Sequence, residues 1–178
     1  MKKLFSWFLI LQSFSLLTVG AYQIYLHESP SQLAFDNYSY AKPEEITQKT
    51  PKRITISSLG IDLPIYKAAI INNIWPTTGS GVSYLTSSPL PGEKGNSVIY
   101  AHNWRSLFGK LVDAKIGDSV VVMYPDNTKK VFIISYTSIV SPSESTILAS
   151  SNDKRITLYT CTGFLDSKRF VAVAILKS

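Results

Sequence analysis

The sequence predicts an all-β domain, a barrel or a sandwich, with one or two short helices, behind an apolar N-terminal helix. From residue 52 onward, short runs rich in β-branched and aromatic residues alternate with turn-forming residues at short spacing. Helical periodicity appears in that region only over short segments. Hydrophobic residues make up 45% of the 178-residue chain and aromatic residues 12%, which is enough for a well-filled core.

The longest apolar run covers residues 4–26. About 23 helical residues at about 1.5 Å each span about 34 Å, enough to cross the hydrocarbon core of a bilayer. Lys2 and Lys3 precede the run and favour a cytoplasmic N-terminus, which puts the rest of the chain outside the membrane. A cleaved signal peptide is the alternative, with residues 19–21 as a small-residue cleavage site. We expect a retained single-pass anchor over residues 1–27, because the apolar run continues past that site.

Residues 28–51 are predicted to form a polar stalk between the membrane and the domain, because they show no sustained period of 2 or 3.6. Some of its apolar and aromatic side chains are expected to pack on the domain or on lipid headgroups. They are Leu33, Phe35, Tyr38 and Tyr40.

The domain itself is predicted over residues 52–178, with six to eight strands. Its β-type runs are residues 53–57, 62–66, 82–85, 97–101, 119–124, 130–140, 156–159 and 170–176. Pro64 favours an edge or end position for its strand, since proline cannot donate to a strand ladder. Short helices are predicted near residues 105–114 and over residues 143–150.

The formal net charge is +6, and the basic residues are scattered along the chain. A solvated basic surface is the simplest interpretation. We expect no nucleic-acid partner, because no stretch has the clustered Lys and Arg of a nucleic-acid-binding face. The single cysteine excludes an intramolecular disulfide.

The last two runs read as a β-hairpin with a loop at residues 162–168. Residues that flank a hairpin loop face each other, with Cβ atoms about 4.5–5.5 Å apart. The hairpin therefore predicts that Cys161 lies beside Arg169 at one end of the sheet. Of the two histidines, His102 follows a strand-like run, whereas His27 ends the apolar segment and is treated as incidental.

Each of these three residues, Cys161, His102 and Arg169, more often has a structural role when it occurs alone, but together they fit a thiol enzyme. A thiolate is a nucleophile, and a nearby cation lowers its pKa. An imidazole protonates a departing amine and deprotonates an incoming one. A guanidinium is always charged and stabilises the oxyanion that acyl transfer creates.

The segment Thr157-Leu-Tyr-Thr-Cys161 resembles the TLxTC motif of sortases, the cysteine transpeptidases of bacterial envelopes. Four further segments follow in the family's order. They resemble its opening strands, the strand that leads to its histidine, the segment before its motif strand and the strand that carries its arginine: residues 53–64, 91–102, 136–144 and 169–174. The resemblance covers residues 53–176.

This resemblance implies an eight-stranded sortase barrel and a reaction without a cofactor. Cys161 attacks a C-terminal sorting signal of a surface protein, and the thioacyl-enzyme passes its acyl group to an amine of a cell-wall precursor or a pilin lysine. His102 takes the acid/base role and Arg169 the oxyanion role. Thr160 and Thr162, on either side of the cysteine, are candidate substrate-binding residues.

Some positions depart from common family patterns. Gly163 stands where proline is frequent, and Ala101 where glycine is frequent. Residues 81–96 hold one acid, Glu93, where calcium-activated members hold several. Because calcium takes about six to eight oxygen ligands, we expect no metal requirement. The stalk has no clear Asp-Pro-Trp-like lid motif, and the short loop after Cys161 is most like class D or a related housekeeping form.

The alternatives to a sortase are an inactive barrel and a thiol enzyme of the papain-like or L,D-transpeptidase kind. An inactive barrel would serve as an envelope scaffold or peptide-binding module, but the presence of His102, Cys161 and Arg169 together argues against it. A papain-like enzyme places its cysteine before its histidine, whereas here the histidine comes first. L,D-transpeptidases carry a different His/Ser/Gly setting around their cysteine.

Overall fold

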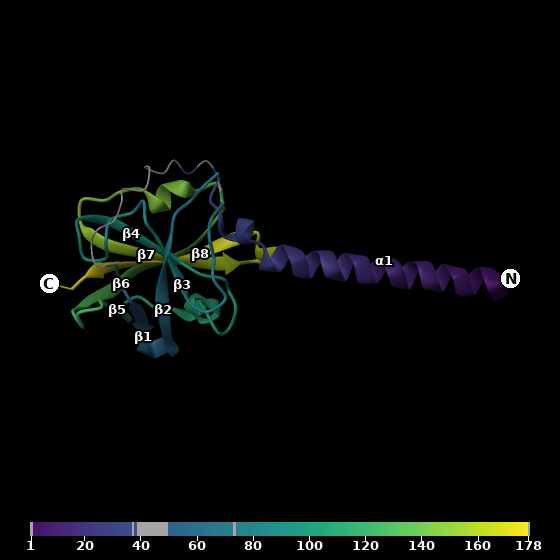
Figure 1. Cartoon of the computed structure of the whole chain (residues 1–178), viewed down its shortest axis with the longest axis horizontal. Coiled ribbons are helices and arrows are strands. Elements are labelled where there is room, and N and C mark those ends of the chain that lie inside the picture. The colour runs from purple at the N-terminus through teal and green to yellow at the C-terminus, as the bar shows by residue number, and fades with distance from the viewer. Residues whose placement is uncertain (1, 37, 39–49, 73, 178) are drawn as a thin grey trace.

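The computed structural model describes residues 2–36, 38, 50–72 and 74–177, without the side chains of residues 2–5, 26–28, 30 and 31. One long helix projects from a closed β-barrel (Figure 1). The helix, α1, is Lys2–Glu28. The expectation for Tyr40 lies outside the described residues.

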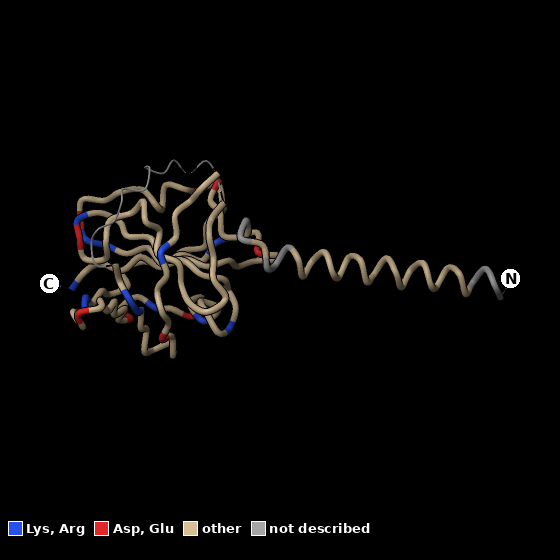
Figure 2. Tube along the Cα trace, viewed as in Figure 1, with Lys and Arg blue, Asp and Glu red and all other residues tan. Residues whose placement is uncertain are grey.

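The large apolar side chains described on α1 are exposed and do not pack on the barrel. Trp7 is 65% exposed and Leu17 72% exposed. Ser6–Tyr25 contains no Asp, Glu, Lys or Arg, and the charged positions in Figure 2 lie on or next to the barrel. By length and composition this stretch is able to cross a membrane, a test that a signal sequence also passes. The predicted apolar helix is therefore confirmed as a candidate membrane span.

The domain is an eight-stranded closed barrel, as the resemblance implied. Its strands are β1 (Arg53–Ile56), β2 (Ile61–Ala68), β3 (Val82–Leu85), β4 (Gly95–Tyr100), β5 (Ser119–Met123), β6 (Lys129–Val140), β7 (Lys154–Thr162) and β8 (Lys168–Leu176). They pair in the order β1-β2-β3-β4-β7-β8-β6-β5, and β5 pairs with β1 to close the barrel.

The helices predicted inside the domain are shorter and tighter than expected. Short 3₁₀ turns occur at η1 (Pro30–Leu33), η2 (Ser57–Leu59), η3 (Gly109–Asp113), η4 (Ser145–Leu148) and η5 (Phe164–Asp166). Around η3 the amides of Leu107, Leu111 and Ala114 each donate to the carbonyl three residues earlier. Tight turns, and not the predicted helix, therefore bury these apolar side chains against the barrel.

Pro64 lies where β2 has a strand partner on one side only. It pairs with Arg53 on β1, whereas the pairing of β2 with β3 begins at Ile65. The missing amide hydrogen of proline therefore costs no ladder bond, which accounts for a proline inside a closed sheet.

Two pairings bring the important strand ends together. Parallel pairing sets Tyr100 on β4 opposite Tyr159 on β7. Antiparallel pairing sets Cys161 opposite Arg169 on β8, in the register predicted for the closing hairpin. Because His102 follows Tyr100 by two residues, as Cys161 follows Tyr159, the histidine emerges at the cysteine end of the barrel.

Strand β7 is buried on both faces, because side chains alternate across a strand and each face is covered. Leu158 points into the barrel interior, which is the main core. Tyr159 and Cys161 belong to a second apolar cluster. That outer cluster also contains Trp75, from the loop between β2 and β3, and Leu148 of η4.

Candidate active site

Cys161 lies near the end of β7 and is 2% exposed. Its side chain is on the outer-cluster face, next to Arg169 on β8. The thiol donates a hydrogen bond of 2.8 Å to the carbonyl of Gln32. The sulfur is therefore enclosed by the barrel on one side and by the segment after α1 on the other.

His102 lies two residues beyond β4 and is 4% exposed. Its ring stacks on Trp104, with centroids 4.7 Å apart and planes 11° apart. The backbone is fixed as well, since the amide of Phe108 donates to the His102 carbonyl over 3.1 Å. Stacking and backbone bonding together define the orientation of the imidazole.

The guanidinium of Arg169 is 3% exposed and is held by backbone carbonyls. Nη1 donates to the carbonyls of Asp166 at 2.9 Å and Lys168 at 3.0 Å. Nη2 donates to the carbonyl of Ala34 over 2.9 Å. Within the described part of the chain Nε has no hydrogen-bond partner, which leaves one buried donor of the guanidinium unused.

The loop between β7 and β8 has a specific shape. Gly163 has φ of 80°, and Leu165 and Asp166 are also left-handed, with φ of 51° and 58°. This geometry turns the carboxylate of Asp166 toward Asn103, whose Nδ2 donates to Oδ1 over 2.6 Å. The arginine loop and the histidine loop are thereby joined through the residue that follows His102.

The segment that follows α1 covers the reactive groups. The carbonyl of Gln32 accepts from the thiol, that of Leu33 from the Tyr159 hydroxyl at 3.0 Å, and that of Ala34 from Arg169. The side chains of Leu33 and Phe35 are buried in the outer cluster. Tyr38 packs against Trp75 of the same cluster. The described side chains expected to pack on the domain or on lipid headgroups thus pack on the domain, and the segment covers the site without a lid motif.

Burial governs the protonation of the thiol. It raises the pKa of Cys161 to about 12, an effect that the positive charge of Arg169 reduces and the negative charge of Asp166 increases. Because a raised pKa favours the protonated form, the thiol is neutral near pH 7 in this arrangement. A thiolate forms here only when the burial is relieved.

The two threonines beside the cysteine differ. Thr160 is fully buried on the opposite face of β7, and its hydroxyl donates to the carbonyl of Ala101 over 2.9 Å. This bond ties β7 to the residue before His102. Thr162 is half-buried at the end of β7, where it pairs with Lys168.

Several residues of the site did not emerge from the sequence. Asp166 and Asn103 carried no signal beyond their turn-forming type. Tyr159 was one residue of a β-type run, and Trp75 belonged to a predicted loop, although it is buried in the structure. The signal for the covering segment was the presence of apolar side chains, Leu33 and Phe35, in a polar stretch. Among the described residues no group of His, Cys, Asp or Glu is placed to hold a metal ion, and the prediction of metal independence stays a prediction.

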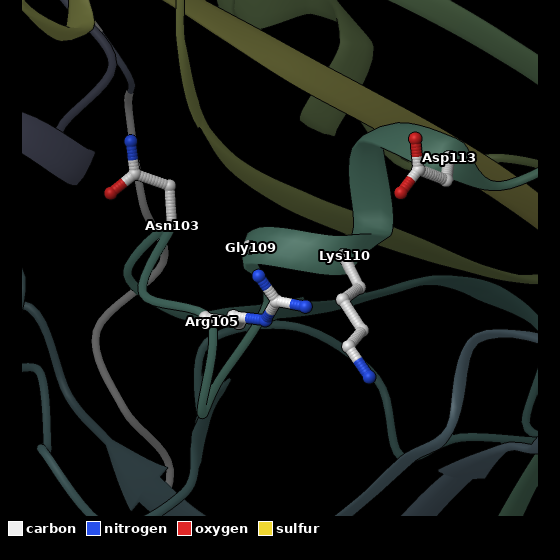
Figure 3. A pocket seen from close by; sticks show the side chains of 5 residues that line it. All are labelled: Asn103, Arg105, Gly109, Lys110 and Asp113. Carbon is white, nitrogen blue, oxygen red and sulfur yellow. The ribbon is translucent and has the colours of Figure 1, made fainter.

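A cavity of about 320 Å³ lies beside the histidine loop. It is lined by Asn103, Arg105, Gly109, Lys110 and Asp113. In Figure 3 the Arg105 guanidinium lies beside Gly109 and the start of η3, whereas Asp113 lies at the far end of that turn. Two cations thus occupy one end of the cavity and a carboxylate the other.

Comparisons with known proteins identify the family of this chain. The family model described as the sortase domain matches residues 54–177. Sortase A of Listeria monocytogenes and sortase A of Bacillus anthracis are each 28% identical over 128 residues, or 70% of this chain. The matched region spans only 55% and 58% of the length of these relatives.

A solved structure gives the same result. The crystal structure of Listeria monocytogenes sortase A superposes with a TM-score of 0.58 at 25% identity, covering 74% of this chain and 89% of the other. The family match extends over well more than half of the chain and includes every strand from Ile54 onward. This chain belongs to the sortase family.

Proposed function

We propose that this chain is a membrane-anchored sortase that cleaves a C-terminal sorting signal of surface proteins and joins the acyl part to an amine of a cell-wall precursor or a pilin lysine. Sortases are cysteine transpeptidases, and family membership supports the reaction class. The observation that carries the proposal is the strand register, in which Cys161 pairs with Arg169 beside the strand that leads to His102.

In the first half of the proposed reaction, the Cys161 thiolate attacks the carbonyl carbon of the scissile peptide bond. Arg169 donates hydrogen bonds to the oxygen that becomes negative, a role that suits a buried guanidinium with an unused Nε donor. The carbon–nitrogen bond breaks, and His102 gives its proton to the departing amine. The acyl group is then a thioester on Cys161.

In the second half, the acceptor amine attacks the thioester carbonyl. His102, now neutral, takes the proton that the amine loses. The carbon–sulfur bond breaks, a new amide forms and the thiolate is regenerated. Water in place of the amine gives hydrolysis instead of transfer.

The covering segment has to leave before a sorting signal binds. The carbonyl of Ala34 occupies the Nη2 donor of Arg169, and the carbonyl of Gln32 occupies the thiol. Both groups are needed by the substrate peptide. We therefore assign the described arrangement to a resting state in which residues 32–36 block the site.

The proposed arrangement in the envelope follows from α1. Residues 1–27 serve as a single-pass anchor with a cytoplasmic N-terminus, residues 28–51 connect it to the barrel, and residues 52–178 form the extracytoplasmic catalytic domain. Since Gln32 follows the end of α1 by four residues, the resting state keeps the cysteine end of the barrel near the membrane surface.

The test uses the full chain in detergent micelles with a panel of sorting-signal peptides and an amine. Mass spectrometry is expected to show cleaved peptide and amine-transfer product for the wild type, and neither product for Cys161→Ala. Ser167→Ala, in the exposed part of the same loop, is the matched control and keeps both products. Cleavage that persists in Cys161→Ala would refute the assignment of the nucleophile.

An inactive barrel that binds peptides is the second candidate, favoured by the neutral, covered thiol. It predicts that the full chain binds sorting-signal peptides without cleaving them. It also predicts no cleavage when the covering segment is loosened by Leu33→Ser together with Phe35→Ser. Cleavage by that double variant eliminates the scaffold function.

A further inference from the structure

We infer that the cavity lined by Asn103, Arg105, Gly109, Lys110 and Asp113 binds an anionic group, a carboxylate or a phosphate, of the amine acceptor. The inference rests on the proposed transpeptidase function. The second substrate then arrives from the side of the histidine loop and is recognised by its negative charge.

The reaction needs two separate binding regions, because the acceptor amine attacks while the acyl part of the first peptide is still bound. The outer cluster around Trp75 and Tyr159 is the region that residues 32–36 occupy in the resting state. The cavity shares no lining residue with that cluster. It is therefore free for a second ligand while the first region is filled.

The cavity is adjacent to the groups that an acceptor must meet. Its wall residue Asn103 directly follows His102, so their Cα atoms are about 3.8 Å apart. The amide of Asn103 donates to the carboxylate of Asp166, and the carbonyl of Asp166 accepts from Arg169. An acceptor whose anionic group binds there presents its amine from the histidine side of the cysteine, where His102 removes the proton.

The charges of the cavity favour an anion. Arg105 and Lys110 contribute two positive charges against one negative charge on Asp113. Neither Arg105 nor Lys110 is part of an ion pair among the described residues, such as Arg53–Asp62 and Arg155–Asp153.

The shape of the cavity also suits a ligand. A guanidinium fits a carboxylate or phosphate through two parallel hydrogen bonds. A volume of about 320 Å³ is at the lower end of the range for small-molecule sites. The loop closes tightly, since a Cβ on Gly109 would lie 2.5 Å from the carbonyl oxygen of Asn103. The cavity is therefore built for a small charged group and not for a bulky apolar one.

The test compares three acceptors with the full chain and one cleavable peptide. Glycylglycine has a free carboxylate, glycylglycine amide has the same amine without it, and hydroxylamine is small and uncharged. We expect the KM for glycylglycine to be about tenfold below that for the amide, as for a hydrogen-bonded charge pair. In Arg105→Ala with Lys110→Ala this advantage disappears, while the KM values for the amide and for hydroxylamine stay the same.

Lys154→Ala is the matched control, because Lys154 is an exposed lysine at the opposite end of β7 from Cys161. It is expected to keep the preference for the carboxylate. Arg105→Glu is expected to reverse the preference, so that the amide becomes the better acceptor. A wild type that uses glycylglycine and its amide equally well overturns the inference, as does a preference that survives the double substitution.

The two proposals fail in different ways. Failure of the proposed function removes peptide cleavage itself, which is measured without any amine. Failure of the inference leaves cleavage and hydroxylamine transfer intact and removes only the preference for the charged acceptor. Titration calorimetry of the full chain with glycylglycine and with its amide gives an independent reading, since it requires no turnover.

Discussion

Cys161 has two neighbours of opposite kind. On one side the β7–β8 hairpin fixes it against Arg169 through a continuous register of paired residues. On the other side the backbone carbonyls of residues 32–34 accept one hydrogen bond from Cys161 itself and two from its neighbours Tyr159 and Arg169. The first contact persists as long as the barrel is folded, whereas the second can be undone while the barrel stays intact. The β7–β8 hairpin therefore builds the site, whereas residues 32–34 block it.

The free-energy terms that favour and oppose the docking of residues 32–36 on the site nearly cancel. Burying Leu33 and Phe35 stabilises it by about 3–6 kcal/mol. Three hydrogen bonds add about 2–5 kcal/mol. Ordering five residues costs about 5–10 kcal/mol of conformational entropy. A substrate peptide that makes equivalent contacts is therefore able to displace the segment.

The largest effect is expected from a substitution in the β7–β8 hairpin. Arg169→Ala removes the donor that faces the reacting carbonyl, and the kcat/KM for peptide cleavage is expected to fall by about 10²–10³. Arg169→Lys restores only part of this loss, because an ammonium lacks the planar fork of donors. Steady-state kinetics with one cleavable peptide measures both variants, and wild-type rates in Arg169→Ala would contradict the oxyanion role.

Substitutions that loosen residues 32–36 are expected to raise the reactivity of Cys161 and not to lower it. Leu33→Ser with Phe35→Ser removes the apolar anchors of residues 32–36, so Cys161 becomes hydrated and its pKa falls. Each pKa unit lost gives about tenfold more thiolate at neutral pH, and alkylation by a small thiol reagent is expected to accelerate by at least about tenfold. Ile139→Ser, on the exposed face of β6, is the control. Equal alkylation rates for all three proteins would show that the segment does not restrict the thiol.

The same comparison predicts a difference in pH dependence. The pKa of Cys161 is raised to about 12 when the segment is docked, so the thiol stays protonated below that value. The alkylation rate of the wild type is therefore expected to keep rising through pH 10, whereas that of the Leu33→Ser, Phe35→Ser variant levels off earlier. A wild-type rate that levels off near pH 8 contradicts the burial of the thiol.

The smallest effect is expected from a substitution of Asp166, in the loop of the β7–β8 hairpin. Asp166→Asn keeps an oxygen acceptor for Asn103 and removes a negative charge that raises the pKa of Cys161. Alkylation is expected to become a few-fold faster, by about two- to fivefold, without loss of the fold. Asn103→Ala leaves the charge in place and breaks the link between the loops, so it is expected to slow peptide cleavage without the gain in alkylation.

The sequence predicted the β7–β8 hairpin far better than the contact of residues 32–34 with the site. Strand periodicity and the turn residues around Gly163 define the register that pairs Cys161 with Arg169, because both signals are local. The contact of residues 32–34 with the site joins segments about 130 positions apart and uses backbone carbonyls, which carry no sequence signal. The link from Asp166 to Asn103 is hidden for a related reason, since it depends on a left-handed loop of non-glycine residues.

The measurement that tests the account most directly is the covalent state of Cys161 in the full chain after brief exposure to a cleavable sorting-signal peptide. Peptide mapping by mass spectrometry is predicted to find the acyl part of the substrate on the fragment that contains Cys161. The adduct is predicted to accumulate faster in the Leu33→Ser, Phe35→Ser variant than in the wild type. A peptide that binds both proteins and leaves no adduct on Cys161 in either would contradict the account.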